Sequence, residues 1–186
     1  KDDRVKAVIV RINSPGGTTA GGEALYTRLR KLAQETNKKF LFNIFGETIE
    51  IDRIILECLN DPLVHLLRNA VDHGMETPSE RKRLGKPDTG VITLEAFQKD
   101  AKTIEVVLSD DGKGIDKDII RQKAIQNGLC TPSEASKLSD SEIYDFIFHS
   151  GFSTKDSVTT VSGRGLGMAI VRDSIDKVGG KILIET

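Results

Sequence analysis

The chain lacks tryptophan and contains few other aromatic residues and only two cysteines among its 186 residues. Aromatic residues make up 5% of the sequence, which argues against a surface built to stack nucleic-acid bases. Cys58 and Cys130 stand in unrelated contexts, without a CxxC motif or the His/Cys spacing of a metal site. The cysteines therefore predict neither a disulfide framework nor a zinc centre.

A dominant charge and long apolar runs are lacking as well. Lysine and arginine number 27 and aspartate and glutamate 28, so no global field favours nucleic acid or an anionic membrane. No apolar run approaches the roughly 18 residues that a membrane span needs, and no signal peptide opens the sequence. Hydrophobic residues make up 38% of the chain, enough for a sizeable core. These features predict a soluble cytoplasmic protein, with no nucleic-acid partner and no membrane insertion.

Apolar periodicity predicts an alternation of strands and helices along the chain. Strands are predicted at residues 5–12, 39–45, 90–97, 103–109 and 181–185. Helices are predicted at residues 24–34, 51–59, 61–73, 116–126, 140–148 and 165–177. Residues 150–167, rich in glycine, serine and threonine, predict a mobile connection. The fold class is therefore α/β (α+β): a two-layer sandwich of a mixed sheet with helices on one face.

The helix that follows Pro62 collects polar residues on one face. At 100° per residue, five polar side chains fall on the side opposite the leucines, namely His65, Arg68, Asn69, Asp72 and His73. An ordinary solvated face is the alternative, but such faces usually carry Lys and Glu, which this one lacks. Asparagine and histidine are indifferent helix formers, so their presence favours a functional face. Asn69 and His65 suit a metal ion, and Arg68 suits a phosphate.

Two glycine-containing loops carry the other candidate chemistry. Asp110–Gly114 (DDGKG) follows a strand, where a carboxylate can accept a hydrogen bond from the amine of adenine; a simple turn is the alternative. Ser162–Gly167 (SGRGLG) opens a helix and can present backbone N–H groups to a polyphosphate; a flexible linker is the alternative. It matches neither the dinucleotide fingerprint nor the Walker loop. Gly151–Lys155 (GFSTK) adds hydroxyls and a cation.

The order of these segments is more specific than any one of them. An asparagine helix followed by DxGxG, GFSTK and GxGxG resembles the gyrase, Hsp90, histidine kinase and MutL (GHKL) ATPase superfamily. Five segments are similar to the catalytic domain of chemotaxis histidine kinases of the CheA family: residues 63–74, 85–87, 110–116, 151–155 and 162–168. The resemblance covers about residues 29–186. It implies the GHKL sandwich fold, ATP and Mg²⁺ as cofactors, and the activity of a histidine protein kinase in two-component signalling.

The same resemblance implies a role for each matched residue. Asn69 would be the magnesium ligand, with His65 as its catalytic and metal-binding neighbour near the γ-phosphate. Asp110 would receive the adenine amine, with Gly112 and Gly114 shaping that pocket. Further nucleotide contacts are implied at Arg68, Asp72, His73, Ser153, Thr154, Lys155, Gly163, Gly165 and Gly167. The sequence departs from the family pattern at Ser150, usually proline, and at Ala169, commonly acidic. Both departures concern the lid over the nucleotide.

Residues 1–28 resemble a different family. Asp3–Gly17 is similar to signal peptide peptidases of the SppA type, Ser/Lys proteases with a crotonase-like fold. No counterpart of their nucleophile or base follows, so Ser14 is not interpreted as a nucleophile. The sequence thus predicts a chimera of residues 1–28 and 29–186. CheA-type domains usually add a hairpin strand after one like residues 181–185, and we expect residues 5–12 to dock at or near that strand.

Four function classes are compatible with these observations. They are a kinase domain that phosphorylates a histidine on another domain, a GHKL ATP hydrolase or ATP-gated module, a peptidase fragment, and an engineered chimera with little turnover. The hydrolases carry glutamate one turn before the asparagine, where this chain has His65, so the kinase is favoured. Nothing marks His149 as a phospho-acceptor. The resemblance therefore implies an acceptor domain in trans and a chemoreceptor and adaptor complex around the parent protein.

Overall fold

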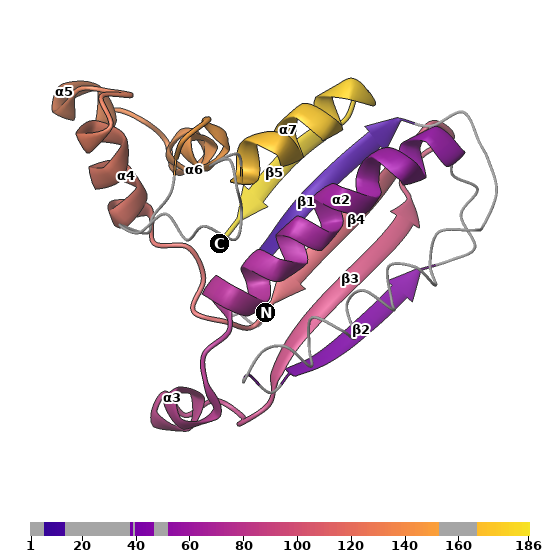
Figure 1. The fold of residues 1–186 in the computed structure, drawn as a ribbon, viewed down its shortest axis with the longest axis horizontal. Coiled ribbons are helices and arrows are strands. Elements are labelled where there is room, and N and C mark those ends of the chain that lie inside the picture. Colours follow the sequence, from indigo (N-terminus) through magenta and orange to yellow (C-terminus); the bar gives the residue numbers. More distant parts are fainter. Residues whose placement is uncertain (1–5, 14–37, 39, 47–51, 153–166) are drawn as a thin grey trace.

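A computed structural model describes residues 6–13, 38, 40–46, 52–152 and 167–186 (Figure 1). Within these residues five strands form one sheet in the order β2-β3-β4-β1-β5. The strands are β1 (Lys6–Asn13), β2 (Phe40–Gly46), β3 (Gly90–Gln98), β4 (Thr103–Asp110) and β5 (Lys181–Glu185). β2 and β3 run parallel, and the other neighbouring strands run antiparallel. The predicted mixed sheet is confirmed.

Two helices cover one face of this sheet. They are α2 (Arg53–Asn69) and α7 (Gly167–Lys177), which pack against each other (Figure 1). α2 continues into a π-helical turn, η1 (Ala70–Gly74). The remaining described helices are α3 (Pro78–Arg83), α4 (Lys117–Gln126), α5 (Pro132–Ala135), α6 (Asp140–Asp145) and the 3₁₀ turn η2 (Phe146–Phe148).

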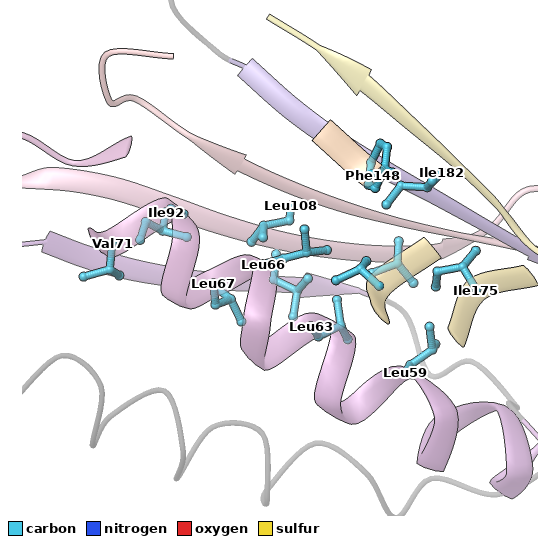
Figure 2. Close-up of a cluster of buried hydrophobic side chains, with 14 of the residues drawn as sticks. Leu59, Leu63, Leu66, Leu67, Val71, Ile92, Leu108, Phe148, Ile175 and Ile182 are labelled. Carbon is cyan, nitrogen blue, oxygen red and sulfur yellow. The ribbon is translucent and has the colours of Figure 1, made fainter. Parts of the chain in front are cut away.

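The main core lies between α2 and the sheet, as Figure 2 shows. α2 contributes Leu59, Leu63, Leu66 and Leu67, and the strands contribute alternate residues such as Ile92 and Leu108. Burial of one such side chain contributes roughly 1.5–3 kcal/mol. Because these leucines fix which side of α2 faces the sheet, they also fix which side carries the polar residues.

The structure corrects the prediction of separate helices at residues 51–59 and 61–73. A single helix runs through Pro62, which lacks an N–H for the helical hydrogen-bond ladder. A proline inside a helix costs about 3 kcal/mol or more. Leu59 and Leu63, on either side of Pro62, are both buried in the core, and their burial offsets that cost. At its start, Asp52 Oδ1 accepts a hydrogen bond from the Ile54 N–H at 2.7 Å.

β1 lies inside the sheet, between β4 and β5. Val10 is paired with Val106 on one side and with Ile182 on the other. The prediction that the N-terminal strand docks at residues 181–185 is confirmed. The crotonase-like origin of residues 1–28 stays a prediction, because residues 1–5 and 14–37 lie outside the described part of the chain.

Candidate functional site

The polar face of α2 is the first half of the site. His65 and Asn69 are half-buried, whereas Arg68, Asp72 and His73 are exposed. The N-terminus of α7 lies next to this face: Asn69 Nδ2 donates to Met168 Sδ at 3.2 Å. A Cβ added to Gly167 would lie 3.5 Å from His65 Nε2. The structure therefore brings the predicted residues His65, Asn69 and Gly167 together.

The pKa of His65 is lowered, mainly by burial and then by the positive charge of Arg68 and by His73. The imidazole is therefore neutral at neutral pH. A neutral imidazole can accept a hydrogen bond or a proton on one nitrogen while donating from the other.

The end of α2 is widened into the π turn η1. The Met75 N–H donates to the Ala70 carbonyl at 2.8 Å, which closes the five-residue turn. Lys38 Nζ donates to the carbonyls of Val71 at 2.7 Å and Asp72 at 2.9 Å, so carbonyls of this turn have a cationic partner. Single π turns of this kind occur frequently at functional sites.

The Asp110–Gly112 loop is the second half of the site, and it lies against η1. A Cβ on Gly112 would lie 2.3 Å from the Gly74 carbonyl oxygen, so the loop can approach the turn only with glycine there. The Lys113 N–H donates to the same oxygen at 3.0 Å. A Cβ on Gly74 would lie 3.0 Å from Asp110 Oδ1. The predicted Asp110 and Gly112 are thereby joined to the asparagine helix.

Asp110 is a partly buried carboxyl group at the end of β4. Its Oδ1 accepts the Gly112 N–H at 2.9 Å. Burial raises its pKa; this N–H opposes the rise, and the nearby charges of Asp111 and Glu76 add to it. Gly114 follows with φ +74, a conformation that glycine adopts without strain. The loop therefore presents a carboxylate acceptor close to two residues without side chains, Gly112 and Gly114.

Four charged residues in or next to this loop were not predicted from the sequence. They are Glu76, Arg81, Lys86 and Asp111, joined by hydrogen bonds and ion pairs. Lys86 and Asp111 lay in segments that match the family, 85–87 and 110–116, but neither was given a role, and Glu76 and Arg81 lay outside the matched segments. The available signal was the density of charges at residues 76–86, together with the second aspartate of the DDGKG segment.

Five predicted contacts lie outside the described residues: Ser153, Thr154, Lys155, Gly163 and Gly165. Among the described residues, no three His, Cys, Asp or Glu side chains are grouped to hold a metal ion. Mg²⁺ commonly takes one or two protein ligands and completes its shell with phosphate oxygens and water. The amide oxygen of Asn69 fits that donor set, since magnesium prefers oxygen over the imidazole nitrogen of His65. No described helix has the length and apolar character to cross a bilayer.

Comparison with known protein families identifies the family to which the chain belongs. The model of the "Histidine kinase-, DNA gyrase B-, and HSP90-like ATPase" family matches residues 58–186, well over half of the chain. The chain therefore belongs to this family and carries an ATP-binding domain of the histidine kinase type.

Within this family, the chain is similar to proteins named for chemotaxis and sensor histidine kinases. The chain is 46% identical over 158 residues to "Chemotaxis protein CheA" of Halobacterium salinarum, covering 85% of this chain and 24% of that protein. It is 45% identical over 158 residues to the protein of the same name from Listeria monocytogenes, covering 85% and 25%. With "Sensor histidine kinase CheAY" of Helicobacter pylori, identity is 42% over 158 residues, covering 85% and 20%. The chain thus spans a quarter or less of the length of these relatives.

Proposed function

We propose that the chain is the catalytic domain of a CheA-like histidine protein kinase. It binds Mg-ATP and donates the γ-phosphate to a histidine on a separate domain, in chemotaxis signalling. The observation that carries this proposal is the contact of Gly74 with Asp110 and Gly112. Because η1 continues the helix that carries Asn69, this contact supports a site in which a nucleotide would have its metal near Asn69 and its base near Asp110.

Different residues of the chain contact the base, the metal and the phosphates of the nucleotide. Asp110 accepts the adenine amine, and Gly112 and Gly114 let the base approach the backbone. Asn69 is the protein ligand for magnesium, which when bound neutralises phosphate charge. The contacts with phosphate fall to three exposed residues of α2 and η1, namely Arg68, Asp72 and His73, where Asp72 acts through ordered water or the metal.

His65 lies one turn before Asn69, close to the start of α7. As a neutral imidazole it can accept a hydrogen bond from water or from the incoming acceptor histidine. From the family resemblance we assign residues 150–165, together with Gly167, to the lid and phosphate loop; residues 153–165 lie outside the described part of the chain. Ser153, Thr154, Lys155, Gly163 and Gly165 belong to that loop.

The phosphate acceptor lies on another domain. Of the three histidines, His65 and His73 belong to the nucleotide face, and His149 is exposed with its ring 5.6 Å from that of Phe146. A receptor and adaptor complex would surround the parent protein, as the relatives' chemotaxis names suggest.

A second candidate is an ATP-binding chimera with little turnover. It is favoured by β1, whose sequence resembles another family and which occupies an internal position of the sheet. Residues 1–28 and 29–186 would then have separate origins in one folded unit.

A two-stage experiment tests both candidates. Calorimetric titration with Mg-ADP is expected to give saturable binding at one site. Labelled ATP is then supplied with and without a histidine-containing acceptor domain from a CheA relative. Phosphate transfer to the acceptor, with little release of free phosphate, supports the kinase. Rapid phosphate release without acceptor supports the hydrolase, and binding without either reaction supports the inactive chimera.

A further inference from the structure

An ion-paired group, which we call the charged cluster, joins Asp111 of the Asp110–Gly112 loop to Glu76, Arg81 and Lys86. The Arg81 side chain, from α3, is fully buried, with 0% exposed. Its Nη2 lies 2.6 Å from Asp111 Oδ2, and its Nη1 lies 3.1 Å from Asp111 Oδ1. The same Nη1 lies 3.1 Å from Glu76 Oε2. This fork-to-carboxylate geometry fixes the orientation of Asp111.

Lys86 extends the cluster onto the loop backbone. Its Nζ donates to Glu76 Oε1 at 2.6 Å, to the Asp111 carbonyl at 3.0 Å and to the Gly112 carbonyl at 2.9 Å. These three bonds use all three donors of the ammonium group. Two successive peptide carbonyls of the loop are therefore held by one side chain.

The cluster also ties the loop to the sheet. Asp111 Oδ1 accepts the Val91 N–H at 2.8 Å, and the Asp111 N–H donates to the Val91 carbonyl at 3.1 Å. Asp110 directly precedes these attachments, and its own Oδ1 accepts a hydrogen bond from the Gly112 N–H at 2.9 Å. The orientation of the Asp110 carboxylate is thus set through its neighbours on the C-terminal side.

Stability alone does not account for this arrangement. A buried ion pair is often no more stabilising than apolar residues of the same volume, since both charges lose their hydration. The charged cluster, in which Arg81 and Glu76 are buried and Lys86 and Asp111 are partly buried, gives the loop a fixed geometry instead, because its hydrogen bonds to the loop are directional.

We propose that Lys86 and Arg81 are positioning residues that set the selectivity of Asp110 for the 6-amino group of adenine. The inference rests on the proposed function, in which Asp110 accepts that amine. A correctly aimed carboxylate favours a 6-aminopurine and disfavours a 6-oxopurine, where two acceptors would face each other. Without the hydrogen bonds from Lys86, the loop would still carry the Asp110 carboxylate but would no longer hold it in one orientation.

The test compares Mg-ADP with Mg-IDP binding to the full chain by calorimetry. Lys86→Met keeps the length of the side chain and removes its donors; Lys82→Met, on the exposed surface of α3, is the control with the same charge change. We expect the ADP-over-IDP preference to fall roughly tenfold in Lys86→Met, the size that one or two lost buried hydrogen bonds give, and to stay unchanged in Lys82→Met. Lys86→Gln, which keeps an amide donor, should fall between the two and serves as the test if Lys86→Met does not fold.

The possible results distinguish a failure of this inference from a failure of the proposed function. A preference unchanged in folded Lys86→Met or Lys86→Gln, with only a lower melting temperature, would mean a purely structural cluster and overturns the inference. Asp110→Asn is the arm for the proposed function. If the unchanged chain does not bind Mg-ADP, or if Asp110→Asn leaves the preference intact, Asp110 does not read adenine, and the proposed function fails together with the inference.

Discussion

Asp110 is partly buried, which favours its protonated form, whereas acceptance of a hydrogen bond favours its ionised form. The raised pKa of its carboxyl means that the folded state favours the protonated form more than the unfolded chain does. Its contribution to stability is therefore greatest below the unfolded pKa and is lost as pH rises through the folded pKa. In the proposed function, adenine binding needs the ionised form of Asp110, which appears over that same rise in pH.

We expect Mg-ADP affinity to fall on acidification at a higher pH than for an ordinary aspartate. Asp110→Asn places a donor where an acceptor is needed, so affinity at neutral pH should drop by roughly 1–3 kcal/mol. Calorimetric titrations across the acid range would show whether the unchanged chain has a slope that the variant lacks. Parallel slopes in both proteins would assign the titration to another group.

His65 predicts a second pH effect, on stability. Its lowered pKa means that the unfolded chain binds a proton more readily than the folded one. The resulting stability is present above the unfolded pKa of histidine and is lost as pH falls through the lower folded value. Urea unfolding at a series of pH values should show a smaller loss on acidification in His65→Gln. An identical loss in both proteins would contradict the neutral, desolvated imidazole.

Asn69 offers a test of the metal ligand that does not depend on turnover. Asn69→Ala is expected to weaken Mg-ADP binding much more than binding of ADP in the presence of a chelator, because the lost ligand acts through the metal. Fluorescence or calorimetric titration with and without Mg²⁺ measures the difference. Equal weakening in both conditions would show that Asn69 contacts the nucleotide directly or only supports the fold through Met168.

At the scale of the elements, β1 is the segment whose removal is most informative. Its loss would expose the edges of both β4 and β5. Unpaired edges invite association with other chains. We expect deletion of residues 1–13 to lower the melting temperature markedly and to cause aggregation, whereas deletion of residues 1–5 leaves β1 whole and should have little effect. Thermal unfolding and light scattering distinguish the two; a stable monomer without β1 would contradict the sheet order.

The sequence predicted the type of most elements but not every boundary. Periodicity located the strands because alternate residues such as Ile92 and Leu94 face a core, a pattern that needs no tertiary information. It failed at Pro62, where local geometry favours a helix start and burial of Leu59 and Leu63 overrides it. The short helix α3 was missed, although Thr77 and Glu80 form a capping box at its start.

The candidate site shows the same division. His65, Asn69 and Asp110 could be proposed as site residues because helical spacing and motif order are visible in the sequence. The charged cluster was not found, since Arg81 and Lys86 reach Asp111 only after the chain has folded back along β3 and β4. The π turn was also not predictable, because an i→i+5 bond has no clear sequence pattern.

At the scale of the whole molecule, the sheet joins the two ends of the described chain. Ala7 is the partner of both Ser109 and Glu185. The other antiparallel pair, β3 with β4, closes through a short turn at residues 99–102. The antiparallel pairings of the sheet are therefore one local pair and two very distant ones, beside the parallel pair of β2 with β3.

That arrangement has a consequence for the order of folding. Closing a long loop costs entropy that must be met before the strand pairing is gained, so β3 and β4 should pair early and β1 late. A folding intermediate without β1 in place has unpaired edges on β4 and β5. The β1 strand of a second molecule can pair with these edges as well as the chain's own β1. Refolding at high protein concentration should then give strand-exchanged dimers that dilution during refolding prevents.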